Sequence, residues 1–260
     1  MERYVASSDN TLIHFTASGH GDTAIIFVHG WLGSGDWWNL QKEFFSKQYC
    51  VITLDLAGHG KSGKGRREWS GKLYADDIMA VVNQVDSERI VLVGHSMAGA
   101  YVLEAALLSS RARAIILIDT LKNLDQLMTI QQAEERILGA YRKNFNDAVE
   151  NLLPKFLFCD STPEPIRQQL QKEFLRNDPE FAVNAIEPLY KMDIRELAKR
   201  IEIPVRAINS TFTPTNRENN QKYFRDFDFV SISDTGHYPM LEKPEEFNDL
   251  LHNVIKNLGL

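Results

Sequence analysis

Short apolar runs alternate with helical patterns over most of this 260-residue chain, and this alternation constrains its fold more than any other feature. The runs end directly at polar or turn-forming residues, as Val51–Leu54 ends at Asp55 and Ile90–Val93 ends at Gly94. Continuous β-branched runs of this length are typical of strands buried on both faces of a parallel sheet. The alternation therefore predicts an α/β fold with right-handed crossovers.

The expected elements can be placed by residue number. We expect strands at Ala24–Val28, Val51–Leu54, Ile90–Val93, Ala114–Ile118, Val205–Ile208 and Phe227–Ile232. We expect helices at Trp37–Phe45, Tyr74–Val85, Met97–Leu108, Asn216–Phe224 and Glu245–Leu258. Two earlier segments, Tyr4–Ser7 and Leu12–Ala17, are suited to an antiparallel edge, which brings the expected sheet to eight strands.

Residues 122–200 interrupt this rhythm, because they contain no strand-like run. Amphipathic patterns predict helices at Ile130–Asn144, Asn146–Phe158, Pro165–Arg176, Pro179–Lys191 and Ile194–Arg200. Twelve of the 15 glycines lie between Gly19 and Gly99, whereas only Gly139 falls within residues 121–200. We therefore expect a core of residues 1–121 and 201–260, with a helical insertion of residues 122–200 between two of its strands.

Composition and charge exclude several classes of protein. The 29 basic residues are outnumbered by 35 acidic residues, so the chain offers no basic surface for nucleic acid. Two cysteines cannot build a disulfide framework or a metal cluster. The sequence has neither the apolar core of a signal peptide nor a run of about 18 apolar residues that could cross a membrane. We expect a soluble, cytoplasmic protein without nucleic-acid or membrane partners.

The segment Gly94-His95-Ser96-Met97-Ala98-Gly99 follows a predicted strand at once and leads into a predicted helix. A serine at such a junction lies on a strained turn, with its hydroxyl above the edge of the sheet. Ala98 stands where the pattern G-x-S-x-G has its second glycine, and we interpret it as a tolerated variant. The alternative is that Ser96 only caps the helix, since serine is a favoured N-cap residue.

Two further loops contain residues suited to the same chemistry. His29-Gly30-Trp31 follows an earlier strand, and in an acyl-transfer site of this type the backbone N–H groups of Trp31 and Met97 would form the oxyanion hole. His237 follows the last strand, and therefore lies at the same edge of the sheet as Ser96. Histidine titrates near neutrality and can accept the proton of a serine hydroxyl. An ordinary glycine turn is the simpler interpretation of the first loop.

Four segments resemble the motifs of the α/β-hydrolase fold family, in the family's order and over nearly the whole chain. They are His29-Gly30-Trp31, Asp55 to Ser62, Gly94 to Gly99, and Gly236 to Pro244. The resemblance implies a mostly parallel eight-stranded sheet flanked by helices, with residues 122–200 in the place of the family's all-helical cap. It further implies Ser96 as nucleophile, His237 as base, and an oxyanion hole at Trp31 and Met97. His29, Gly30, His95 and Tyr238, which flank these residues, are predicted to contact the substrate.

The acid of the triad departs from the family's pattern. It usually follows the strand before the last, but the corresponding loop, residues 209–216, holds no carboxylate. Asp119, at the end of the strand after the nucleophile strand, is the preferred candidate, because some members of the fold carry their acid there. Asp234 is a second candidate, although it lies only three residues from His237. Asn209 or Ser210 could also orient the histidine ring without a carboxylate.

Together these residues predict a serine esterase that acts on small to medium uncharged carboxylic esters and needs no cofactor or metal. A serine at position 96 argues against the haloalkane dehalogenases and epoxide hydrolases of this fold, which use an aspartate nucleophile. Three alternatives remain open: a carbon–carbon bond hydrolase, a perhydrolase, and a non-catalytic ligand-binding receptor. The expected partner is a small apolar ester, bound by a monomer or homodimer. Apolar residues of the insertion are expected to line its pocket.

Overall fold

Eight strands form one sheet in the computed structural model of the protein, which describes residues 2–260. The strands are β1 (Glu2–Ala6), β2 (Leu12–Ser18), β3 (Thr23–Val28), β4 (Cys50–Leu54), β5 (Arg89–His95), β6 (Ala112–Ile118), β7 (Val205–Ser210) and β8 (Phe227–Ile232). Their order across the sheet is β1-β2-β4-β3-β5-β6-β7-β8. The pairs β1–β2 and β2–β4 are antiparallel and the others are parallel, which confirms the predicted fold class and the antiparallel edge.

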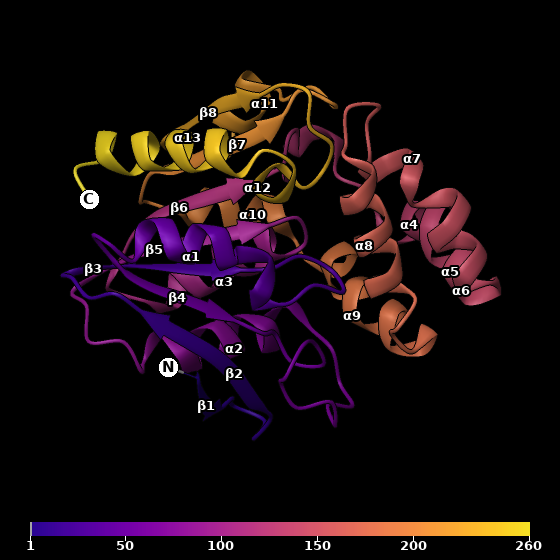
Figure 1. The fold of residues 1–260 in the computed structure, drawn as a ribbon, viewed down its shortest axis with the longest axis horizontal. Helices are drawn as coiled ribbons and strands as arrows, with labels where there is room; N and C mark the ends of the chain where they lie inside the picture. The colour runs from indigo at the N-terminus through magenta and orange to yellow at the C-terminus, as the bar shows by residue number, and fades with distance from the viewer. Residues whose placement is uncertain (1) are drawn as a thin grey trace.

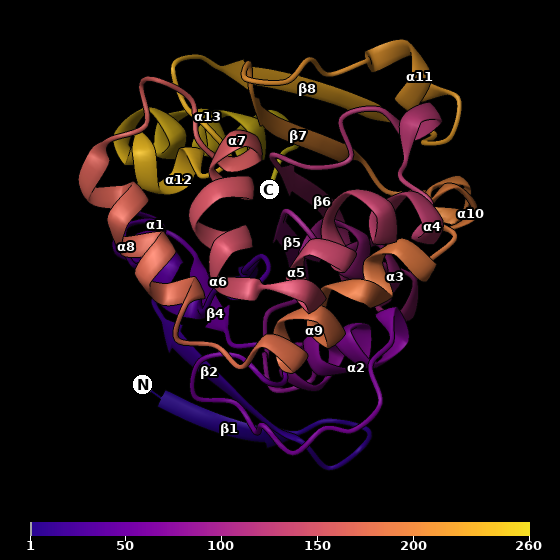
Figure 2. The same cartoon turned by 90° about the vertical axis from the view of Figure 1, so that its right-hand side faces the viewer.

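Helices cover both faces of the sheet (Figure 2). One face carries α1 (Asn39–Phe45), α12 (Pro239–Glu242) and α13 (Pro244–Asn257), and the other carries α2 (Gly71–Val82), α3 (Ala98–Leu108) and α10 (Ile194–Arg200). The short α11 (Arg217–Gln221) connects β7 to β8. Because both faces are covered, every residue of β3 is buried, as the continuous apolar runs predict.

Most of the predicted helices begin or end a few residues away from the predicted bounds, and three of them show how. The first expected helix starts with a 3₁₀ turn, η1 (Gly35–Trp38), and only then becomes α1. Helix α2 begins earlier than predicted, at Gly71, because the Ser70 hydroxyl accepts a hydrogen bond from the Leu73 N–H at 3.1 Å. Helix α11 is shorter than predicted, because Asn216 lies outside it as its N-cap.

Between β6 and β7 the chain forms helices and no strand, as predicted. They are η2 (Leu124–Gln126), α4 (Ile130–Ala133), η3 (Glu134–Leu138), α5 (Gly139–Lys143), α6 (Phe145–Asp147), η4 (Ala148–Leu152), α7 (Pro154–Leu157), α8 (Glu164–Phe174), α9 (Pro179–Lys191) and α10. Both η3 and η4 are π-helical, so each has a wider turn than the α-helical segments around it. Helices α4 to α9 gather beside one edge of the core (Figure 1) and lie in front of it in the turned view (Figure 2).

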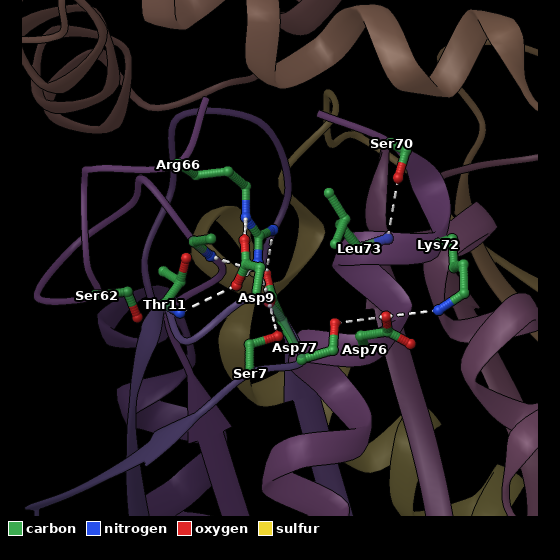
Figure 3. Close-up of polar contacts among 12 residues, drawn as sticks. Ser7, Asp9, Thr11, Ser62, Arg66, Ser70, Lys72, Leu73, Asp76 and Asp77 are labelled. Carbon is green, nitrogen blue, oxygen red and sulfur yellow. Dashed lines mark hydrogen bonds and ion pairs between the residues drawn. The ribbon is translucent and has the colours of Figure 1, made fainter. Parts of the chain in front are cut away.

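An ion-pair cluster centred on the buried side chains of Arg66 and Asp77 joins the turn after β1 to α2 (Figure 3). Arg66 donates to both carboxylate oxygens of Asp77, at 2.6 and 2.9 Å, and to Asp9 at 2.8 Å. The Ser7 hydroxyl donates to Asp77 at 2.6 Å. Since the Asp77 side chain is fully buried, these donors replace the water that its charge would otherwise need. Within residues 2–260, no helix has both the length and the hydropathy required to cross a membrane.

Candidate active site

Ser96 lies on a sharp turn between β5 and α3. Its backbone is in the left-handed region, with φ of +54°, which is uncommon for a residue other than glycine. The Ser96 N–H donates to the Ile118 carbonyl at 3.1 Å, which fixes the turn against β6. A Cβ atom at Gly94 would lie only 2.7 Å from the Ala98 carbonyl oxygen, so glycine is needed where the strand and helix approach each other. The turn thus holds the serine as the sequence motif predicts.

Ser96, His237 and Asp119 form one chain of hydrogen bonds. Ser96 Oγ lies 2.8 Å from His237 Nε2, and His237 Nδ1–H donates to Asp119 Oδ2 at 2.7 Å. The three residues come from the ends of β5, β6 and β8, which meet at one edge of the sheet. Asp234, the second candidate for the acid, has a side chain that is 69% exposed and pairs with Lys243 at 3.7 Å. The structure therefore brings Asp119, and not Asp234, to the histidine.

The Asp119 carboxylate is buried and accepts three hydrogen bonds or ion pairs. Its Oδ1 atom accepts the Ser210 N–H at 2.8 Å and lies 2.7 Å from Lys122 Nζ. Burial raises the pKa of Asp119, but the hydrogen bond and charge of His237, followed by those of Lys122, lower it more. The net pKa lies below the ordinary value, so Asp119 is ionised at neutral pH.

A second carboxylate holds the loop that carries His237. Glu242 of α12 accepts the backbone N–H of Gly236 at 2.8 Å and that of Tyr238 at 3.0 Å, and these two residues flank the histidine. The Thr162 hydroxyl, from the loop after α7, also donates to Glu242, at 2.6 Å. The His237 N–H donates to the Leu157 carbonyl of α7 at 2.8 Å. The loop is therefore fixed from the core and from the inserted helices at once.

The two N–H groups predicted for an oxyanion hole carry no internal hydrogen bond. Within residues 2–260, neither the Trp31 N–H nor the Met97 N–H has an acceptor. A Cβ atom at Gly30 would lie 2.6 Å from His95 Nδ1 and 3.0 Å from Ser96 Cβ, so glycine lets this loop approach the serine. The Trp31 indole donates to the Ala182 carbonyl of α9 at 2.7 Å and stacks on Tyr141 of α5. Free N–H groups beside a serine hydroxyl are suited to bind an oxyanion.

A cavity of about 150 Å³ lies against this chain of hydrogen bonds. Its lining is mainly apolar and aromatic, and it contains no Asp, Glu, Lys or Arg. The lining residues are Trp31, His95, Ser96, Ile137, Tyr141, Leu152, Leu153, Phe156, Leu157, Ile186, Leu189, Tyr190, His237 and Tyr238. Nine of them belong to the inserted helices α4 to α9 and the π-helical segments between them. A larger, open groove of about 580 Å³ is lined by residues of β1, β2 and β4 and by the loops that precede β3 and β5, and no residue of the hydrogen-bonded chain lines it.

Of the four residues predicted to contact substrate, the cavity includes His95 and Tyr238 but not His29 or Gly30. His29 is fully buried, and its ring is committed elsewhere: Nδ1–H donates to the Gly30 carbonyl and Nε2 accepts the Leu56 N–H. Burial lowers the pKa of His29 to about 4, so the ring is neutral. His29 therefore supports the loop before Trp31. Gly30 lets this loop approach Ser96 closely, as described above.

Lys122 and Glu242 were not predicted from the sequence as parts of the site. Lys122 stands in no pattern that distinguishes it from the other lysines of the chain, whereas Glu242 lies in the segment Gly236 to Pro244 that resembles a family motif, without a role assigned to it there. The sequence predicts that apolar residues of the insertion line the pocket but does not say which; among those found there, Ile186, Leu189 and Tyr190 follow the i, i+3, i+4 spacing of one helix face. The part of the chain that the structure describes holds no group of three or more His, Cys, Asp or Glu residues suited to a metal ion.

Comparisons with known proteins give consistent results. A sequence model of the family described as "Alpha/beta hydrolase family" matches residues 25–250. The chain is 41% identical over 98 residues to a "Non-heme chloroperoxidase" of Burkholderia pyrrocinia, and 39% identical over 101 residues to a "Bifunctional esterase/perhydrolase DCH" of Acinetobacter calcoaceticus. Each match covers 37% of this chain, and 35% and 36% of the relative, respectively. The chain thus spans about a third of the length of these curated relatives.

Solved structures resemble the chain over nearly its whole length. An esterase from Thermogutta terrifontis superimposes with a TM-score of 0.84 and 22% identity, covering 99% of each chain. The esterase EaEST from Exiguobacterium antarcticum gives a TM-score of 0.85 and 20% identity, covering 98% of this chain and all of that one. At this level of identity the likeness establishes the shared fold.

Proposed function

Because the chain belongs to the alpha/beta hydrolase family, we propose that it is a serine hydrolase that cleaves small, uncharged carboxylic esters through an acyl-enzyme. One observation carries the proposal: Ser96, His237 and Asp119 form a continuous chain of hydrogen bonds at the wall of an apolar cavity. A serine becomes a useful nucleophile only when a base takes its proton, and here the base is itself oriented by a carboxylate.

Each group has a defined role in the proposed reaction. Ser96 Oγ attacks the ester carbonyl carbon as His237 Nε2 takes its proton, and Asp119 stabilises the resulting imidazolium. The negative charge on the carbonyl oxygen is bound by the N–H groups of Trp31 and Met97. Collapse of this intermediate breaks the bond to the alcohol, which leaves with the proton from His237. Water then attacks the acyl-enzyme by the same route and releases the acid.

The cavity supports a limit on the size and charge of the substrate. A cavity of about 150 Å³ is comparable to one that holds benzene, which favours acyl groups of roughly four to six carbons. Because Asp, Glu, Lys and Arg are missing from its lining, a charged acyl group would lose its hydration without gaining a partner. We further propose that residues 122–200 are a cap, since helices of this segment supply most of the lining.

Two measurements test this function. A fluorophosphonate probe should label Ser96 in the folded protein and should fail to label the Ser96→Ala variant. On p-nitrophenyl esters of two to twelve carbons, kcat/KM should peak near four to six carbons and fall about tenfold by twelve. Absence of labelling, with folding verified by circular dichroism, would refute the serine hydrolase and favour a ligand-binding receptor. Labelling without ester turnover would favour carbon–carbon bond cleavage.

A further inference from the structure

A lysine completes the surroundings of the Asp119 carboxylate. Lys122 Nζ lies 2.7 Å from Asp119 Oδ1, and the lysine side chain is only 12% exposed. The ammonium also donates to the Ser210 carbonyl at 3.0 Å and to the Thr213 hydroxyl at 2.8 Å. A longer contact, at 3.3 Å, joins it to the Thr213 carbonyl, so four acceptors surround its three protons and hold the cation in place.

The contacts of Lys122 connect two loops. Lys122 follows β6, whereas Ser210 ends β7 and Thr213 lies in the loop after it, within residues 209–216. That loop supplies no carboxylate of its own, but the Ser210 N–H donates to Asp119 Oδ1. The loop and Lys122 thus occupy the same oxygen of Asp119 from two sides. The other oxygen, Oδ2, is left to accept the His237 Nδ1–H.

We propose that Lys122 is a positioning residue for the catalytic acid: it fixes which oxygen of Asp119 faces His237, and its charge opposes protonation of the His237 ring. A carboxylate beside an imidazole favours the imidazolium, and a cation bound to that carboxylate weakens this effect. The charge of Lys122 thereby favours the neutral ring, which is the form that can accept the Ser96 proton. The inference rests on the proposed function, because it concerns the base of that reaction.

Few other charged groups face His237. Asp119 and Lys122 approach from the end of β6, His95 from β5, Glu242 from α12, and Tyr141, Tyr190 and Tyr238 line the same cavity. His95 donates its Nε2–H to the His237 carbonyl, and burial lowers the pKa of His95 to about 3, so it contributes no charge. Burial raises the pKa of Tyr141, Tyr190 and Tyr238 above the ordinary value, so they are neutral too. Among these groups, Lys122 is thus the one cation beside the Asp119–His237 pair.

The test compares pH profiles of kcat/KM for Lys122→Met, Lys122→Gln and Lys122→Arg with that of the unmodified protein. Loss of the charge in the Met and Gln variants should move the acid limb upward by about 0.5 to 1 pH unit, because the imidazolium becomes easier to form. The Arg variant should keep the limb within about 0.2 units. Lys222→Met is the matched control, since Lys222 is an exposed lysine paired with Asp125. It removes one positive charge and should leave the acid limb of the kcat/KM profile unchanged.

A second readout is independent of turnover. The C2 proton of the His237 ring, assigned by its absence in His237→Gln, can be titrated by NMR in each variant. An upward shift of its midpoint in Lys122→Met or Lys122→Gln, whichever folds, supports the proposal. An unchanged midpoint overturns it, as does an equal loss of kcat/KM at every pH in both neutral variants. If the unmodified protein hydrolyses no ester, the proposed function fails, while the NMR comparison still decides the role of Lys122.

Discussion

Replacing Asp119 with asparagine should disable the base by reversing its hydrogen bonding. Three donors face the carboxylate: Ser210 N–H and Lys122 Nζ at Oδ1, and His237 Nδ1–H at Oδ2. An amide offers only one acceptor oxygen. This oxygen will face the Ser210 N–H and the Lys122 ammonium, because neither of them can act as a hydrogen-bond acceptor. Its NH₂ group then faces His237 Nδ1, which must become an acceptor. The ring proton moves to Nε2, and Nε2 can no longer take the proton of Ser96.

The magnitude follows from this change of tautomer. In serine proteases, the corresponding change lowers kcat by about 10⁴, which corresponds to about 5.4 kcal/mol of activation free energy. The same loss is expected here in kcat for p-nitrophenyl butyrate at pH 7.5. KM should change little, because the Asp119 carboxylate does not line the cavity. The rate of Ser96 labelling by the fluorophosphonate should fall in parallel.

Asp234→Asn is the control, because it makes the same chemical change at an exposed carboxylate beside His237 in sequence. It should retain kcat within a factor of two. If Asp119→Asn keeps more than a tenth of the original kcat while Asp234→Asn loses most of it, the assignment of the acid is wrong. Circular dichroism and thermal unfolding must show that both variants are folded.

Three further predictions concern other parts of the molecule. Glu242→Gln should lower kcat by about 10- to 100-fold in the ester assay, because three donors face this carboxylate and losing them would displace the loop that carries His237. Thr162→Val removes only one of these donors and should have a smaller effect in the same assay. Ile186→Phe should fill part of the cavity, lowering kcat/KM for p-nitrophenyl hexanoate at least tenfold while that for the acetate stays within threefold. The free energy of unfolding in urea should fall as the pH drops from 6.5 towards 4, because burial lowers the pKa of His29 to about 4 and the unfolded chain therefore binds protons that the folded protein does not. The expected slope is about 1.4 kcal/mol per pH unit for each such histidine, and a stability independent of pH in this range would contradict the reasoning.

Most of the fold could be predicted from the sequence, because the strands are buried on both faces. A residue such as Ile26 or Ile116 has no solvent-facing side, so its whole strand reads as one apolar run. The ends of helices were less predictable. Capping at Ser70 and Asn216 depends on which nearby polar side chain reaches a free N–H, and several candidates stand close together in the sequence.

The candidate site could be predicted where a residue lies in a loop that follows the end of a strand. Ser96, Asp119 and His237 meet because parallel strands end at one edge of the sheet. Lys122 reaches Asp119 because the chain turns sharply after β6, with φ of +46° at Asp119 and +47° at Leu121. Aspartate adopts positive φ more often than most residues but leucine does not, so residue type alone did not mark this turn. Glu242 lies in the matched segment Gly236 to Pro244, but its role depends on its carboxylate reaching the N–H groups on either side of His237, which a sequence motif does not show.

The two π-helical segments have a consequence for how the lining of the cavity can vary. Each holds one residue more than an α-helical turn needs, and η3 (Glu134–Leu138) directly precedes the part of α5 that carries Tyr141 into the cavity. The wide turn takes up this extra residue without rotating the α-helical segments on either side, so deleting one residue there would return the turn to α-helical hydrogen bonding and leave Tyr141 facing the cavity. Ile137, which lies within η3 and lines the cavity, is the side chain that such a deletion would displace. A single-codon deletion is therefore a short evolutionary route to a local change in the cavity, while Ser96, Asp119 and His237 stay in place on the sheet.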